Sequence, residues 1–132
     1  MTQPEESDWH MSPVVPHFEL HEETAASGTY VISVRGEIHV TTAPRFSEHL
    51  QTAIDNGNTS IVLDFSGVEF IDSTGLSVLL AGLRRVTQAQ GRMALICANP
   101  TVLRLFEITR LDATFDIFAD RAGAIAHVTE SA

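Results

Sequence analysis

The sequence predicts a single α/β domain with a mixed, mainly parallel central sheet and about four helices. Short apolar runs rich in β-branched residues alternate with segments whose apolar residues recur at helical spacing. Such alternation requires crossover connections, which join parallel strands. The first two predicted strands instead follow each other around a turn at Ser27-Gly28, so we expect an antiparallel hairpin at the N-terminal edge of the sheet. A chain of 132 residues fits one domain with a substantial core.

The predicted strands differ in how continuously apolar they are. The first alternates weakly around Phe18 and Leu20, which is typical of an edge strand, whereas "SIVLDF" is apolar almost throughout and is expected at the centre, covered on both faces. The second strand is expected to break at Arg35-Gly36, and the third at a turn formed by Ser66-Gly67. The predicted strands are 17–23, 29–34 with a resumption at 37–40, 60–65 with 68–71 after the turn, 93–97 and 115–118.

The predicted helices follow from apolar residues three and four positions apart. The clearest begins after a polar turn and runs to about residue 90, with Leu76, Leu79, Leu80, Leu83 and Val86 on one face. The others are 43–54, a short helix opened by Pro100, and 122–128.

The ends of the first predicted helix carry recognisable signals. Thr41 or Thr42 can cap its start, Pro44 suits its first turn, and Gly57 predicts a left-handed end.

Composition excludes several classes of protein. The net charge is −9 and all eight basic residues are arginines, so nucleic acid and anionic membranes are not expected as partners. Cys97 is the single cysteine, which excludes an intrachain disulfide and is expected to be a small buried apolar residue. No apolar run approaches the roughly 20 residues that span a bilayer, and the start does not read as a signal peptide. We therefore expect a cytoplasmic protein.

Neither the termini nor the histidines indicate a catalytic or metal-binding site. Residues 1–15 lack periodicity and are expected to be a flexible tail, with the domain at 16–128 and a short C-terminal tail at 129–132. His17 and His21 have i, i+4 spacing, but on a strand this separates them by roughly 13 Å, too far to share a metal ion. We expect no metal site and no cofactor.

The segment "EFIDSTGLSVLL" contains the candidate chemistry. A polar turn between a buried strand and a helix lies at the carboxyl side of a parallel sheet, where open α/β folds place their sites. One interpretation is structural: Asp72 or Ser73 caps the helix, and Gly75 removes bulk at its entry. The other is functional, with a hydroxyl that reacts.

Serine nucleophiles and phosphate loops are poor explanations for this turn. The sequence lacks a G-x-S-x-G elbow, a Walker loop and any lysine to serve one. The remaining functional interpretation makes the hydroxyl a substrate, because a phosphate on Ser73 would lie at a helix N-terminus, which favours anions. We expect no enzyme activity.

The arrangement of these motifs resembles the STAS domain of bacterial anti-sigma factor antagonists. The motif "DSTGL" between strand and helix, "VISVRGEIHVTTAPRF" before the first helix and the final "FDIFAD" carry the resemblance, which covers about residues 16 to 128. It implies a binding module whose unphosphorylated form binds an anti-sigma factor that is also a serine kinase, and so releases a sigma factor. Phosphorylation ends that binding, and a serine phosphatase reverses it.

The resemblance also assigns residues. Ser73 is the implied phosphorylation site, with Thr74 as a substitute acceptor. Asp72, Gly75 and Leu76 match the rest of the motif and are expected on the partner surface. That surface is also expected to include residues 37–42, the entry to the first helix, at Glu37, His39 and Thr42.

Two positions depart from the family pattern. His39 stands where the family usually has an aspartate near the phosphorylation site; it could alter kinase recognition, pair with a phosphate, or be a tolerated surface substitution. Arg110 stands where the family favours glycine, so it must adopt a left-handed backbone or end its helix differently.

Two alternatives to the phosphorylated switch stay open. The first is a STAS scaffold or adaptor that is not phosphorylated, in a stress-sensing or lipid-transport complex. The second is a small enzyme or nucleotide binder that uses Asp72, Ser73 and a histidine, although the sequence shows neither a phosphate loop nor a complete triad.

Overall fold

A five-stranded sheet with helices on both faces forms the domain in the computed structural model, which describes residues 17–129. The strands lie in the order of the sequence, β1(Phe18–Thr24), β2(Tyr30–Ile38), β3(Ser60–Ile71), β4(Arg92–Ile96) and β5(Asp116–Phe118). β1 is antiparallel to β2, and every other neighbouring pair is parallel. The predicted fold class, including the antiparallel hairpin at the edge, is confirmed. The predicted tails lie largely outside the described residues.

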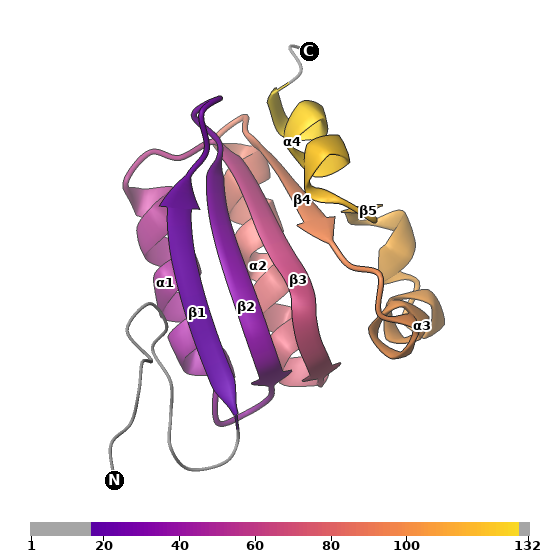
Figure 1. Cartoon of the computed structure of the whole chain (residues 1–132). Helices are drawn as coiled ribbons and strands as arrows, with labels where there is room; N and C mark the ends of the chain where they lie inside the picture. Colours follow the sequence, from indigo (N-terminus) through magenta and orange to yellow (C-terminus); the bar gives the residue numbers. More distant parts are fainter. Residues whose placement is uncertain (1–16, 130–132) are drawn as a thin grey trace, which may run out of the picture.

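Three of the four described helices supply the crossovers between parallel strands that the sequence predicted, and the fourth follows the last strand. The helices are α1(Ala43–Asp55), α2(Ser73–Gln88), α3(Pro100–Ile108) and α4(Arg121–Thr129), with a 3₁₀ turn, η1(Leu111–Ala113), after α3. Figure 1 shows α1 and α2 on one face of the sheet, α4 on the other, and α3 beyond the end of β4. No helix among residues 17–129 is long and apolar enough to cross a membrane.

Two apolar cores follow from this layering. The larger one joins α1, α2 and α3 to one face of the sheet and contains the edge-to-face pairs Phe46–Phe65 and Phe106–Phe115. The smaller one lies under α4, where Ala124 and Val128 pack on Val62 and its neighbours. β3 therefore contributes side chains to both cores, as expected for a continuous apolar strand in the centre of a sheet. Cys97 is buried, and burial raises the pKa of its thiol.

The two expected interruptions of strands do not occur. β2 runs through Arg35-Gly36 and β3 runs through Ser66-Gly67, so the predicted turn at Ser66-Gly67 is wrong. The β2–β3 pairing instead shifts register between Ser33 and Arg35 and again between Gly36 and Glu37. Such bulges bend a strand and keep it paired, because the extra residue is taken up locally.

The ends of the helices agree closely with the sequence. Gly57 has a φ of 95° after α1, and Arg110 has a φ of 64° after α3, so Arg110 adopts the left-handed conformation in place of glycine. α2 begins at Ser73, three residues before the first periodic leucine, because the polar turn itself forms the first turn of the helix.

One polar cluster ties the hairpin to α1. The carboxylate of Glu22 on β1 accepts a hydrogen bond from the hydroxyl of Tyr30 on β2 and contacts Nδ1 of His49 on α1. Burial, followed by the hydrogen bond to Glu22 and the charge of that carboxylate, raises the pKa of Tyr30 to about 12. The cluster thus favours the protonated phenol.

Tyr30 therefore gives a pH-dependent prediction. Tyr30 is the only tyrosine, so absorbance near 295 nm titrates it alone, and we expect a midpoint near pH 12. Because the folded pKa exceeds the unfolded value of 10.0, this contribution to stability is complete below pH 10 and is lost as pH rises towards 12. Glu22→Gln should lower the midpoint only partly, since burial remains. A wild-type midpoint at pH 10 would contradict the prediction.

Candidate partner-binding site

The site is built where β2 and β3 end and α2 begins. The backbone N–H of Asp72 donates to the carbonyl oxygen of Ile38 at 3.1 Å, which holds the two strand ends together. The Asp72 carboxylate then accepts a hydrogen bond from the Gly75 N–H, also at 3.1 Å, and caps α2. The structural interpretation of the aspartate is therefore correct. The capped turn fixes the backbone from which Ser73 projects.

Ser73 is exposed at the first residue of α2. Unpaired backbone N–H groups gather at this end of a helix, together with the positive end of its dipole. A phosphate at Ser73 is therefore compatible with the folded domain. Thr74, the neighbouring hydroxyl, is only partly exposed.

Gly75 allows the start of α2 to lie directly on the sheet. A Cβ at this position would come within 2.6 Å of Ile71 Cγ1 and 2.8 Å of Ile38 Cγ2. Leu76, next along the helix, is only 7% exposed and belongs to the larger core. Both residues therefore position the loop, because Gly75 has no side chain and that of Leu76 packs into the core; their expected contact with a partner stays a prediction.

Thr42 likewise positions the neighbouring loop. Its side chain is buried, donates to the carbonyl oxygen of Glu37 at 2.7 Å and accepts from the N–H of His39 at 3.0 Å. Thr42 is the N-cap residue of α1, yet its hydroxyl does not cap that helix, because these two bonds within residues 37–42 engage it. Thr42 thus shapes residues 37–42, and its expected contact with a partner stays a prediction.

His39 is held in place by its surroundings. Nδ1 accepts a hydrogen bond from the N–H of Thr41 at 3.2 Å, and Nε2 lies 3.6 Å from a carboxylate oxygen of Glu37. The ring centroid is 6.4 Å from that of Phe70 on β3. In the neutral ring the proton is therefore on Nε2, because Nδ1 acts as an acceptor.

The surface contains apolar residues that the sequence analysis missed. Val40 is 67% exposed and Phe70 is 47% exposed, and they flank the turn from residues 37–42 and from the end of β3. From the sequence, Phe70 is an apolar residue of a predicted strand. The shift in β2–β3 register that turns its side chain outward cannot be recognised from the neighbouring residues. The site thus combines the exposed hydroxyl of Ser73 with the exposed side chains of Val40 and Phe70. Acidic residues are near in sequence: Glu69 is exposed, Glu37 lies beside His39, and Asp72 caps α2.

Metal-binding side chains do not converge here. Among residues 17–129, no group of three or more histidine, cysteine or acidic side chains is arranged to hold a metal ion. The carboxylate of Asp72 and Nδ1 of His39 already accept hydrogen bonds from backbone N–H groups.

Comparison with known proteins identifies the family. The model of the STAS domain matches residues 22–124. The chain belongs to the STAS domain family. Among curated relatives, this STAS domain is 29% identical to "Anti-sigma-F factor antagonist RsfB" of Mycobacterium tuberculosis over 77% of the chain and 83% of the relative. It is 31% identical to "Anti-sigma-B factor antagonist" of Staphylococcus aureus over 68% and 83%.

Solved structures are similar over most of the STAS domain. An anti-sigma factor antagonist from Mycobacterium paratuberculosis superposes with a TM-score of 0.79 at 28% identity, covering 86% of this chain and 95% of the other. The Bacillus cell fate determinant SpoIIAA in its phosphorylated form gives a TM-score of 0.65 at 27% identity, covering 83% and 98%.

Proposed function

We propose that this STAS domain is an anti-sigma factor antagonist whose binding is switched off by phosphorylation of Ser73. The exposure of Ser73 at the first residue of α2, beside exposed apolar side chains, is the observation that carries the proposal. The names of its relatives and the phosphorylated form of SpoIIAA support it. The partner is an anti-sigma factor that is also a serine kinase, a serine phosphatase restores the hydroxyl, and the exchange takes place in the cytoplasm.

The electrostatics of the surface make such a switch effective. A phosphate adds about −1.5 to −2 charges at neutral pH. It would join the carboxylates of Glu37, Glu69 and Asp72 on a surface that the partner must cover. Placing that charge in a packed interface costs on the order of 2–5 kcal/mol, which corresponds to roughly 30-fold to several thousand-fold in affinity.

The protein acts by binding and carries out no reaction itself. A serine nucleophile needs a free base, but the Asp72 carboxylate accepts from Gly75 and Nδ1 of His39 accepts from Thr41. Ser73 is therefore a substrate for the partner, with Thr74 the substitute acceptor.

A phosphorylation assay tests the proposal. The purified protein is incubated with its cognate anti-sigma factor and ATP, and the modified residue is located by mass spectrometry. We expect one phosphate on Ser73, no label on Ser73→Ala, and unchanged labelling of Thr87→Ala, whose hydroxyl is exposed towards the other end of α2. Equal labelling of wild type and Ser73→Ala refutes the assignment. Stable binding with no phosphate at all would instead favour the scaffold role.

A further inference from the structure

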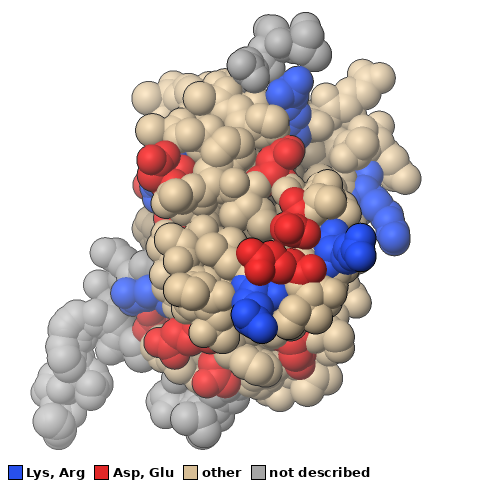
Figure 2. All heavy atoms as spheres, turned by 90° about the vertical axis from the view of Figure 1, so that its right-hand side faces the viewer, with Lys and Arg blue, Asp and Glu red and all other residues tan. Residues whose placement is uncertain are grey.

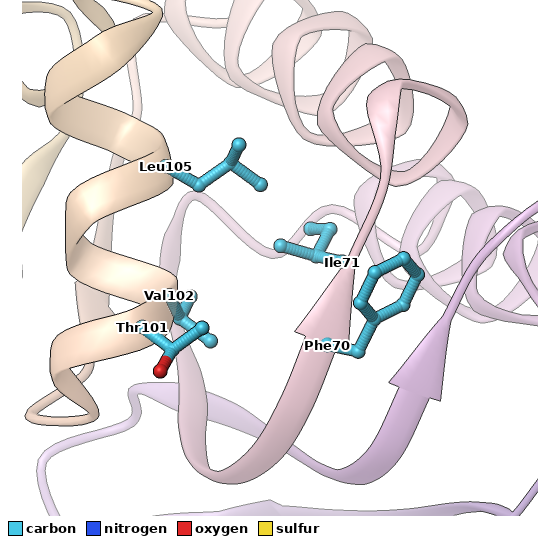
Figure 3. A pocket seen from close by; sticks show the side chains of 5 residues that line it. All are labelled: Phe70, Ile71, Thr101, Val102 and Leu105. Carbon is cyan, nitrogen blue, oxygen red and sulfur yellow. The ribbon is translucent and has the colours of Figure 1, made fainter.

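An apolar pocket lies between the end of β3 and α3. Its volume is about 160 Å³, and it is lined by Phe70 and Ile71 of β3 and by Thr101, Val102 and Leu105 of α3. Figure 3 shows the three α3 side chains on the side of the helix towards the end of β3, with Ile71 pointing towards Leu105. Small-molecule sites are usually about 300–1,000 Å³, so this pocket suits a single apolar side chain.

Exposed apolar side chains gather around the pocket. Among the described residues, the large apolar side chains that are exposed are Val40, Phe70 and Ile108. Phe70 lines the pocket, and Ile108 follows Leu105 by three positions, which makes the two neighbours on the surface of α3. Val40 follows His39, whose ring centroid lies 6.4 Å from that of Phe70. Such a gathering of exposed apolar side chains is typical of a surface that another protein covers.

Charge does not determine what fills the pocket. Arg104 and Glu107 are both exposed on α3, and Glu69 is exposed on β3. Figure 2 shows acidic and arginine side chains interspersed on the face over α3, β5 and α4. Because charges of both signs are present, apolar contact and shape select the occupant.

The pocket adjoins the turn that carries Ser73. Ile71 lines the pocket and is the last residue of β3, and α2 begins two residues later. The Cα atoms of Ile71 and Ser73 are therefore no more than about 7 Å apart. A stable interface covers about 800 Å² on each partner, which is a patch roughly 30 Å across. A protein that is centred on Ser73 thus also covers the pocket.

We infer that the anti-sigma factor inserts one apolar side chain, of about the size of leucine, into this pocket and so anchors the complex beside Ser73. Apolar anchors that fill a pocket typically supply a large share of the affinity of an interface. Thr101 and Leu105 help to select the anti-sigma factor, because they form the wall that the inserted side chain contacts. The inference rests on the proposed function, since it names a further contact with the same partner.

Calorimetry with the cognate anti-sigma factor tests the anchor. Thr101→Trp should fill the pocket and weaken binding about 10- to 100-fold, the range for withdrawing one buried leucine. Thr87→Trp, the same change at an exposed position in the last turn of α2, should bind like the wild type. Thr101→Val keeps the shape of the side chain and removes only the hydroxyl, so it should also bind normally. Circular dichroism during heating checks that each variant is folded.

Methyl resonances locate the contact even if the tryptophan variant does not fold. In the wild-type protein with labelled methyl groups, adding the unlabelled anti-sigma factor should shift the resonances of Leu105 and Ile108, whereas those of Ile125 on α4 should not move. Unshifted Leu105 resonances, or equal affinity of the wild type and Thr101→Trp, would overturn the inference. Shifts of Leu105 that depend on the concentration of this protein alone would also overturn it, because a second copy would then occupy the pocket.

The outcomes separate the anchor from the phosphorylation switch. If Ser73→Glu weakens binding and Thr101→Trp does not, the anchor is refuted and the proposed function stands. If the wild type neither binds the anti-sigma factor nor is phosphorylated by it, both are refuted.

Discussion

Replacing Ser73 with glutamate is expected to weaken binding of the anti-sigma factor about 30- to 150-fold, the lower part of the range for a phosphate because glutamate carries a single charge. The charge would be buried on a surface that already holds the carboxylates of Glu37 and Asp72. The fold should be unchanged, because an acidic side chain in the first turn of α2 stabilises a helix by about 0.3–1 kcal/mol. Calorimetry gives the affinity, and circular dichroism during heating gives the stability.

Two controls separate charge from shape. Ser73→Ala removes the hydroxyl without adding charge and should bind like the wild type. Thr87→Glu places the same carboxylate on the same helix, far from the turn, and should also bind normally. Full binding by Ser73→Glu would mean that the partner does not cover the start of α2. Loss of binding by Ser73→Ala would mean that the hydroxyl itself is a contact, independent of any switch.

The fold could be predicted because its elements carry local signals. The apolar face of α2, from Leu76 to Val86, repeats at helical spacing for three turns, and few other structures bury such a pattern. The continuous run at the start of β3 likewise required cover on both faces. The order of elements then favoured right-handed crossover connections and a mainly parallel sheet.

Strand interruptions could not be predicted in the same way. Ser66-Gly67 is a common turn sequence, yet β2 keeps β3 extended through it. Gly67 contributes, since a Cβ there would come within 2.6 Å of Arg35 Cγ on the neighbouring strand. The glycine serves close approach between strands, and only the partner strand reveals this.

The sequence predicted which residues form the site more reliably than it predicted which of their side chains are exposed. The motif located Asp72 and Ser73 at the start of α2, where the structure has them. It could not show that Phe70 faces outward, because the register shift between β2 and β3 just upstream resets which side each strand residue takes. Loops that connect the layers have no repeating apolar pattern, so the exposure of their residues cannot be predicted from spacing.

Gly36→Ala is expected to cause a large loss of stability, roughly 2–6 kcal/mol, from backbone strain and overpacking together. Gly36 has a φ of 100°, and a Cβ there would come within 2.2 Å of the carbonyl oxygen of His17. That oxygen accepts the hydrogen bond from the Glu37 N–H at 2.9 Å. The methyl group must therefore separate β1 from β2 at the point where residues 37–42 begin. Denaturation in urea measures the loss.

Gly57→Ala provides the matched control. Gly57 has a nearly identical φ of 95°, but a Cβ there meets no atom within 4 Å, so only the left-handed strain of about 1–2 kcal/mol applies. The excess loss in Gly36→Ala thus isolates the contact between β1 and β2. Equal losses in the two variants would show that the strands part without cost at this end. In that case β1 would not hold residues 37–42 in position, and the geometry of the partner surface would depend on the β2–β3 pairing alone.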